Sequence, residues 1–163
     1  MYYSFIMLKP DALERQLALK IIERLKANDI AIEIFDYRIV SEDLIFKHYS
    51  HAIAEFGEVF KEMATNTFVG KYVIPMIISS SDENIISIVR KTIGATDPSK
   101  AAPGTIRGEL GDDNMEKATL EVRCCANLIH ASDSYESYLS EAKLWFSRDM
   151  EKYQNECHAS IRK

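Results

Sequence analysis

The stretch Tyr2–Val40, YYSFIMLKPDALERQLALKIIERLKANDIAIEIFDYRIV, contains two apolar segments on either side of an amphipathic one. Residues 2–8 are almost entirely apolar and are stopped by Lys9-Pro10, because proline offers no amide to a strand ladder. Residues 30–40 alternate apolar and polar side chains, which indicates a strand with one buried face. The stretch therefore predicts the order strand, helix, strand.

The segment between these two strands has the spacing of an amphipathic helix. Its apolar side chains recur every three or four residues, which places them on one face of the helix: Leu17, Ala18, Ile21, Ile22 and Leu25. We expect Asp11 to cap the start of this helix and Asn28-Asp29 to close it.

The rest of the chain continues the alternation of helices and strands. Ser41 can begin the next helix, because its hydroxyl can accept a hydrogen bond from an otherwise unpaired amide. The further elements expected are a strand over 71–78, a helix from Ser81 or Asp82 to Gly94, a long loop over 95–114, a strand over 121–131 and a helix over 135–146. Alternation of this kind predicts layers of helices and sheet, for which the split βαβ arrangement is one compact solution.

Composition indicates one globular domain over residues 1–163, with 47% apolar and 28% charged side chains and no linker or repeat. A net charge of −5 gives no general attraction for nucleic acid or anionic membranes, so a phosphate ligand must be held locally. The apolar run Tyr72–Ile78 is far shorter than the roughly 18 residues of a membrane span. The N-terminus has no positive charge before its apolar run, which argues against a secretory signal. We expect a cytoplasmic protein with no membrane partner and no specific nucleic-acid partner.

The three cysteines, Cys124, Cys125 and Cys157, are an odd number without the spacing of a disulfide framework. This usage is typical of free thiols in a reducing compartment. Cys157-His158 together with the adjacent pair could supply metal ligands, although the sequence has no CxxC spacing to favour that alternative.

Phosphate binding, if present, depends on side chains, because the sequence contains no GxxxxGK[ST] and no GxGxxG. The long loop and the helix before it offer polar and cationic groups that could hold an anion: Arg90, Thr96, Lys100, Thr105 and Arg107. The alternative is that these side chains are solvated surface groups.

His130 is the candidate nucleophile, because it ends an apolar run and has hydroxyl and carboxylate neighbours. A neutral imidazole can attack an electrophile when one nitrogen is free and a hydrogen bond to the other fixes the tautomer. Glu141, in the following helix, is the expected orienting carboxylate. The alternative is a structural histidine. The other histidines, His48, His51 and His158, lie in more polar segments without a comparable setting.

The segment Asn127-Leu128-Ile129-His130-Ala131-Ser132-Asp133 resembles the N-x-x-H-G-S-D signature of nucleoside diphosphate kinases. Further motifs of that family occur in the same order and cover most of residues 3–146: Met7-Leu8-Lys9-Pro10-Asp11, His48-Tyr49, Thr96-Asp97-Pro98, Pro103-Gly104-Thr105-Ile106-Arg107-Gly108, and Ser132-Asp133-Ser134 through Glu141-Ala142-Lys143-Leu144-Trp145-Phe146. Chance does not explain several separate motifs that occur in the order of the family.

The resemblance implies an α+β, ferredoxin-like βαββαβ fold, with an antiparallel four-stranded sheet and helices on one face. It also implies ping-pong transfer of the γ-phosphate from a nucleoside triphosphate to a nucleoside diphosphate through a phosphohistidine at His130. Tetramers or hexamers of identical chains are expected.

The family's site residues transfer by motif to catalytic His130 and Glu141 and to nucleotide-binding Lys9, Tyr49, Phe56, Arg90, Thr96, Arg107 and Asn127. The resemblance further implies Mg²⁺ bound with the nucleotide phosphates. Asp133 would reach that ion through water rather than directly.

Three departures from the family pattern concern the nucleotide site. The base-stacking aromatic is Phe56 or Phe60, because the usual P-F-F run is missing; we choose Phe56. The long nucleotide loop, about 95–120, contains an extra stretch near 111–119 that adds acidic residues. Cys125-Ala126 replaces the usual G-R, and Ala131 replaces the glycine after the signature histidine.

The alternative function is that of a catalytically weak relative that senses nucleotides or binds proteins. This alternative predicts damage among the catalytic residues, which the sequence does not show.

Overall fold

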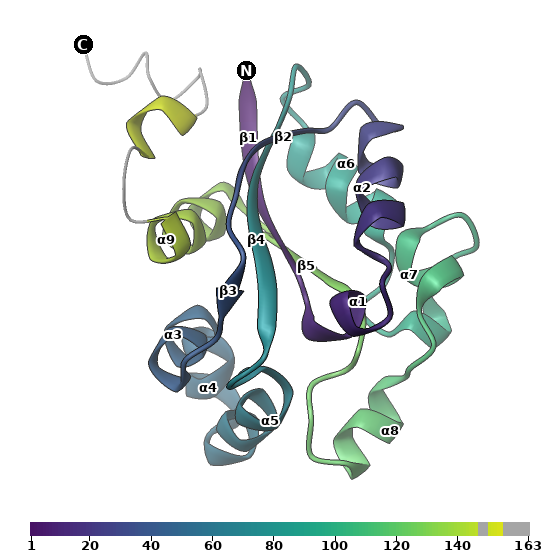
Figure 1. Ribbon diagram of the computed structural model, residues 1–163, viewed down its shortest axis with the longest axis vertical. Coiled ribbons are helices and arrows are strands. Elements are labelled where there is room, and N and C mark those ends of the chain that lie inside the picture. The colour runs from purple at the N-terminus through teal and green to yellow at the C-terminus, as the bar shows by residue number, and fades with distance from the viewer. Residues whose placement is uncertain (147–149, 155–163) are drawn as a thin grey trace.

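The computed structural model describes residues 1–146 and 150–154, and its centre is an antiparallel sheet (Figure 1). The main strands lie in the order β2-β4-β1-β5, and the short β3 pairs with β4. Their bounds are β1 Tyr2–Leu8, β2 Ala31–Phe35, β3 Arg38–Ile39, β4 Tyr72–Ser80 and β5 Ile129–Ala131. Register places Ile6 of β1 opposite Met76 of β4 and Ala131 of β5. This antiparallel order confirms the ferredoxin-like α+β prediction.

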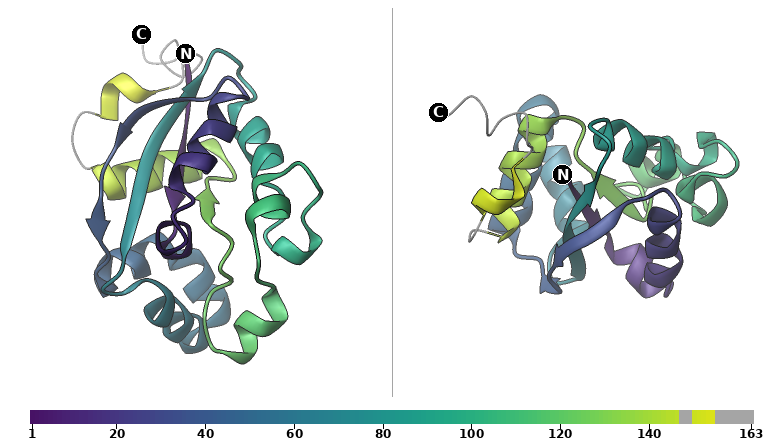
Figure 2. Two further views of the ribbon diagram at one scale, coloured as in Figure 1. Left: turned by 45° about the vertical axis from the view of Figure 1, so that its right-hand side comes forward. Right: turned by 90° about the horizontal axis from the view of Figure 1, so that it is seen from above.

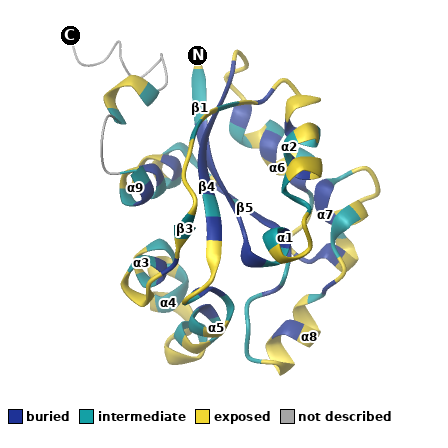
Figure 3. Ribbon diagram, viewed as in Figure 1, coloured by how far each residue is buried: buried dark blue, intermediate teal, exposed yellow. Residues whose placement is uncertain are grey.

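Helices cover both faces of the sheet, so the expectation of helices on one face was wrong (Figure 2). Ile6 and Leu8 of β1 point into one buried cluster, while Phe5 and Met7 point into the other. A strand that is buried on both faces reads as a continuous apolar run rather than an alternating one, as β1 does. Figure 3 shows that β1 and its neighbour β4 are largely buried.

The helices divide between the two faces. The helices α2 (Ala18–Lys26) and α6 (Ile85–Ile93) pack with Ile6, while α3 (Glu42–His48), α5 (Glu58–Phe68) and α9 (Tyr135–Phe146) pack with Phe5. The remaining helical elements are α1 Pro10–Glu14, α4 Ser50–Phe56, η1 Pro98–Lys100, α7 Ile106–Leu110, α8 Met115–Leu120 and η2 Met150–Tyr153. No helix in residues 1–146 and 150–154 is long and apolar enough to span a membrane.

The helix expected from Asp11 to Asn28-Asp29 is two helices, α1 and α2, because Gln16 adopts a left-handed backbone with φ of 56°. The N-cap of α1 is Lys9, with Pro10 in its first turn, rather than Asp11. The Asp11 carboxylate instead accepts a hydrogen bond from the amide of Leu128 at 2.9 Å. The residue chosen as a helix cap is therefore a tether to the signature segment.

The ends of two other helices test the capping predictions. Ser41 caps α3 as predicted, because its hydroxyl accepts the Leu44 amide at 3.3 Å. The helix α6 begins later than expected, with Asn84 at its N-cap, while Asp82 accepts the Asn84 amide at 2.8 Å. Gly94 ends α6 as predicted, with a φ of 90°.

Three predicted segments differ from the structure in length or type. The strand over 30–40 is broken into β2 and β3, and β2 carries a register shift between Ile32 and Ile34. The loop over 95–114 contains η1 and α7. Thr105 is the N-cap of α7, and its hydroxyl accepts the Gly108 amide at 3.0 Å. The strand over 121–131 is reduced to β5, since Val122 and Leu128 have left-handed φ angles of 50° and 72°.

Candidate active site

His130 lies on β5, which is an edge strand of the sheet, opposite Met7 of β1. Its Nε2 is 2.8 Å from Oε1 of Glu141 on α9. The other carboxylate oxygen of Glu141 accepts a hydrogen bond from the Ser132 hydroxyl at 2.5 Å. A carboxylate at Nε2 holds the proton on that nitrogen, so Nδ1 keeps its lone pair. Nδ1 has no hydrogen-bond partner among residues 1–146 and 150–154, which leaves it available for attack.

The backbone before His130 is held in an unusual conformation. Leu128 is fully buried with a φ of 72°, a region that costs energy for a side chain of this kind. Its amide donates to Asp11, and its carbonyl accepts the Lys9 amide at 2.9 Å. The Arg107 guanidinium donates to the carbonyls of Asn127 and Ile129 on either side, at 3.0 and 2.5 Å. These contacts fix where β5 begins and therefore where the imidazole of His130 stands.

His48 is buried beside His130, with the two ring centroids 4.5 Å apart and the planes at 77°. Its Nδ1 accepts a hydrogen bond from Nε1 of Trp145 at 3.2 Å, so the proton of the neutral ring sits on Nε2. Burial, followed by the charge of His130, lowers the pKa of His48 well below its ordinary value. His48 belongs to the His48-Tyr49 motif, but its contact with the nucleophile was not predicted, because only folding brings the two rings together.

A cleft of about 400 Å³ opens at His130. It is lined by every site residue predicted from the sequence except Phe56: Lys9, Tyr49, Arg90, Thr96, Arg107, Asn127, His130 and Glu141, together with Asp133. Phe56 is 60% exposed and lies outside this lining, whereas Phe60 is part of it. Sequence reasoning also missed Met63 and Met115, since their apolar side chains carry no motif, and it named Cys124 only as a free thiol or a metal ligand.

Two buried cations stand in the polar part of the cleft. The ammonium group of Lys9 donates to Oδ1 of Asn127 at 2.9 Å and to the Cys125 carbonyl at 2.6 Å. Burial, and then the neighbouring charge of Arg90, lowers the pKa of Arg107 to about 10. Burial also lowers the pKa of Lys9. Each of the two groups has N–H groups left beyond its protein contacts. The cluster therefore favours a polyanionic ligand.

Three other polar side chains complete the polar part of the cleft. Burial raises the pKa of Tyr49, so its hydroxyl stays protonated and can donate a hydrogen bond beside His130. Hydrogen bonding from the Ser137 hydroxyl lowers the pKa of Asp133, which therefore stays ionised. The side chain of Asn127 donates to the Thr96 carbonyl at 2.8 Å and links the nucleotide loop to the signature segment.

An apolar part of the cleft adjoins the polar one. The Tyr49 ring contacts both, with its centroid 6.1 Å from that of His130 and 5.5 Å from that of Phe60. Further apolar lining comes from Met63 of α5 and Met115 of α8. A cleft with cations at one part and an aromatic and thioethers at another suits a ligand that joins phosphates to a flat, apolar group.

In the described part of the chain, three side chains that can ligate a metal ion lie close together in the cleft. Ligand atoms of His48, His130 and Glu141 lie within 4.8 Å of one another. However, Nε2 of His48 carries a proton, and Nε2 of His130 is paired with Glu141. Neither of these nitrogens therefore offers a lone pair to a metal ion. Cys124 is half-buried and Cys125 is buried, both are free thiols, and burial raises the pKa of each. Cys157 and His158 lie outside the described residues.

Comparison with known proteins agrees with this geometry. The family model described as nucleoside diphosphate kinase matches residues 3–150. The chain is 36% identical to a nucleoside diphosphate kinase of Staphylococcus epidermidis over 144 residues, which covers 88% of this chain and 87% of that one. It is 39% identical to one of Methanothermobacter thermautotrophicus over 144 residues, which covers 88% and 85%.

A solved structure shares the fold. A nucleoside-diphosphate kinase of Borrelia burgdorferi, a transition state mimic with bound vanadate and ADP, superposes with a TM-score of 0.83 at 25% identity, over 97% of this chain and 95% of that chain. The match of sequence extends over nearly the whole described chain, and the cleft supplies the groups that phosphate transfer requires. The chain belongs to the nucleoside diphosphate kinase family and is a phosphotransferase.

Proposed function

We propose that the chain transfers the γ-phosphate of a nucleoside triphosphate by a ping-pong route through His130. The observation that carries the proposal is the pairing of Nε2 of His130 with Glu141 at 2.8 Å, beside a cluster of cations in one cleft. The lone pair of Nδ1 attacks the γ-phosphorus, and the bond from phosphorus to the β–γ bridging oxygen breaks. The diphosphate leaves with that electron pair. A terminal oxygen of a second diphosphate then attacks the phosphorus and breaks the N–P bond.

Each neighbouring side chain has a role in this transfer. Glu141 fixes the tautomer of His130 and stabilises the positive charge that the ring acquires. Arg107 and Lys9 stabilise the charge that spreads over the equatorial oxygens of the phosphoryl group, and Tyr49 donates a hydrogen bond there. Arg90 and Thr96 hold the β-phosphate, and Asn127 meets the ribose.

The base is held at the apolar part of the cleft. We propose Phe60 rather than Phe56 as its stacking partner, because Phe60 lines the cleft and Phe56 does not. Stacking on an aromatic ring is tolerant of base identity, since every base has a π face.

Mg²⁺ fits this cleft as an ion carried by the nucleotide. Mg²⁺ prefers oxygen ligands and is usually held by one or two carboxylates together with substrate phosphates. Asp133 is an ionised carboxylate in the lining and would meet the ion through water. When bound, the ion neutralises charge on the phosphates.

Incubation with γ-labelled ATP and Mg²⁺ tests the proposal. We expect label on the protein that is acid-labile, base-stable and removed by added GDP. His130→Gln should lose the label and still bind ADP. A folded, nucleotide-binding chain that takes no label would favour the catalytically weak alternative, and label retained in His130→Gln would place the nucleophile elsewhere.

The chain is further proposed to act in the cytoplasm as a homo-oligomer, a tetramer or a hexamer. The free thiols of Cys124 and Cys125 suit a reducing compartment. The edge strand β2 exposes Phe35, at 66%, next to an apolar groove lined by Ile22, Ile32 and Met76. Light scattering after gel filtration should give the mass of an oligomer, and the mass of a single chain would contradict the proposal.

A further inference from the structure

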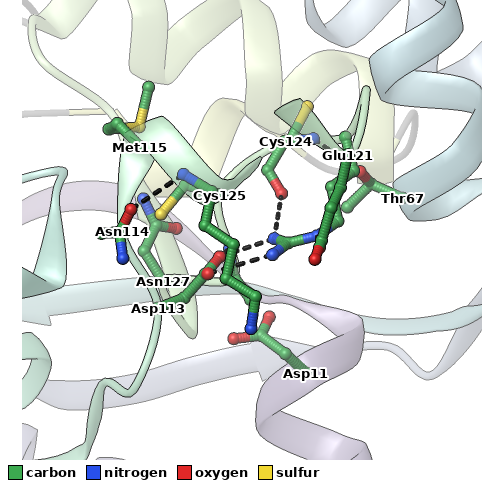
Figure 4. A network of polar contacts seen from close by, with 12 residues as sticks. Asp11, Thr67, Asp113, Asn114, Met115, Glu121, Cys124, Cys125 and Asn127 are labelled. Atoms are coloured by element: carbon green, nitrogen blue, oxygen red, sulfur yellow. Dashed lines mark hydrogen bonds and ion pairs between the residues drawn. The ribbon is translucent and has the colours of Figure 1, made fainter. Parts of the chain in front are cut away.

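The extra segment, residues 111–123, includes the extra stretch near 111–119. An ion pair between Asp113 and Arg123 closes it at its base (Figure 4). Asp113 accepts two hydrogen bonds from the guanidinium of Arg123, at 2.6 and 3.0 Å. It also accepts the amide of Ala126 at 2.8 Å, immediately before the signature segment. A two-pronged pair between a nearly buried carboxylate and an arginine is among the most directional of protein contacts. The extra segment is therefore a closed unit whose ends are joined.

This unit is also tied to the walls of the cleft. The Cys124 amide donates to the Thr67 hydroxyl at 2.8 Å, and Asn66 donates to the Val122 carbonyl at 2.9 Å, so the end of the segment is fixed to α5. At its other end, the pKa of Asp97 is lowered first by the Ser99 hydroxyl and also by the backbone amide of Met115. The segment is therefore held to α5 at one end and to Asp97 at the other.

Met115 is the first residue of α8 and lines the cleft along with Phe60 and Met63 of α5. Its side chain is 39% exposed, although it is apolar and its backbone is held in place. In Figure 1, α8 and α5 lie at the same end of the molecule. We propose that Met115 is a specificity-determining residue, which packs on the nucleobase from the α8 wall while Phe60 packs on it from the α5 wall.

The proposal rests on the proposed function, because it takes the orientation of the nucleotide from the cation cluster. With the terminal phosphate at His130, the base must lie in the apolar part of the cleft, where Met115 and Phe60 are found. A thioether packs favourably against aromatic rings through its polarizable sulfur and offers no strong hydrogen-bond donor. Met115 should therefore discriminate by the area of the ring and favour purines over pyrimidines.

Calorimetric titration of the full chain tests this role, with ADP, CDP and ribose 5-diphosphate as the probes. Met115→Ala should raise the Kd for ADP about fivefold, within the range of a sulfur–aromatic contact. The rise should be smaller for CDP, and the Kd for ribose 5-diphosphate, which lacks a base, should not change. Met115→Leu should retain most of the ADP affinity.

Leu120→Ala is the matched control, because Leu120 ends the same helix, is 78% exposed and does not line the cleft. Its Kd for ADP should equal that of the unsubstituted chain. An unchanged Kd for ADP in Met115→Ala would overturn the proposal, and so would an equal loss of affinity for ribose 5-diphosphate. Phosphohistidine formation is read separately, by labelling the unsubstituted chain, so a failure of the proposed transfer is distinguishable from a failure at Met115.

Discussion

At the scale of single residues, the chemistry depends on which nitrogen of His130 carries the proton. Glu141 faces Nε2, and Ser132 holds the second carboxylate oxygen. The buried ring of His48 packs against His130 and limits its rotation. The nucleophile is thus oriented by contacts from α9, β5 and α3 together.

Glu141→Gln should slow phosphorylation of His130 strongly while nucleotide binding changes little. The amide keeps the volume of the side chain but removes the negative charge that favours a proton on Nε2. We expect a fall in the single-turnover rate on the order of 10²-fold, as for a misoriented reacting group. Rapid quench with labelled ATP measures that rate. Ser132→Ala is the matched control and should cost much less, and equal losses in the two variants would contradict the role of Glu141.

Residue identities in the site were largely predictable from the sequence, and their supporting contacts were not. The motifs named Lys9, Arg107, Asn127, His130 and Glu141, and the structure gathers all of them in one cleft. The burial of His48 could not be read from its polar neighbours, because it results from packing against Trp145, a residue 97 positions away. Phe56 ends α4, whereas Phe60 lies in α5 and lines the cleft. The sequence could not decide between them, because the motif that marks the aromatic is missing.

At the scale of elements, the turn between α6 and α7 depends on Gly94. Its φ is 90°, and an added Cβ would lie 2.4 Å from the Thr105 hydroxyl, which caps α7. Its carbonyl also accepts a hydrogen bond from Arg107 at 3.1 Å. This turn therefore couples the end of α6 to a cation of the cleft.

Gly94→Ala should lower the free energy of unfolding by about 3 kcal/mol, the sum of a left-handed backbone and an overpacked contact. Gly70→Ala is the matched control, because Gly70 has a φ of 75° but nothing within 4 Å of an added Cβ. It should cost only about 1 kcal/mol. Urea denaturation measures both values. Equal losses would show that the contact with Thr105 contributes nothing.

The pair of Asp113 and Arg123 should make the stability of the extra segment depend on pH. The hydrogen bonds of the guanidinium hold the pKa of Asp113 far below its ordinary value. A lowered folded pKa gives stability that is present above the unfolded pKa and is lost as the pH falls through the folded one. Asp113→Asn should therefore cost about 2 kcal/mol at pH 7, with the difference shrinking below roughly pH 4.

Denaturation with urea at pH 7 and at pH 3 measures this difference. Asp112→Asn is the neighbouring control, because Asp112 pairs with Arg15 at 3.1 Å but its side chain is 63% exposed. Such exposed pairs contribute under about 1 kcal/mol. A loss in Asp113→Asn that stays the same at both pH values would contradict the electrostatic origin.

Element boundaries were less predictable than element types. The strand β1, the helix α6 and the helix α9 follow directly from apolar periodicity. The breaks at Gln16 and Leu128 do not, because both residues adopt left-handed backbones. At Leu128 a tertiary hydrogen bond to Asp11 maintains that conformation. The helix α8 was hidden for a similar reason, since its capping residue Asn114 lies in a run that reads as loop.

At the scale of the whole molecule, a sheet buried on both faces carries the nucleophile on one of its edge strands, β5. One layer supplies Glu141 from α9 and Tyr49 from the junction of α3 and α4. The other layer supplies Arg90 from α6 and Arg107 from α7. The cleft lies where the two layers meet at β5. That arrangement explains why motifs spread from residue 7 to residue 146 act at one point.

The most direct measurement is the position of phosphorus on the phosphorylated chain. Nuclear magnetic resonance of ¹⁵N-histidine-labelled protein, phosphorylated with ATP and Mg²⁺, distinguishes the two ring nitrogens by their coupling to phosphorus. We predict phosphorus on Nδ1 of His130, with the proton kept on Nε2 beside Glu141. Phosphorus on Nε2, or on another histidine, would contradict the account.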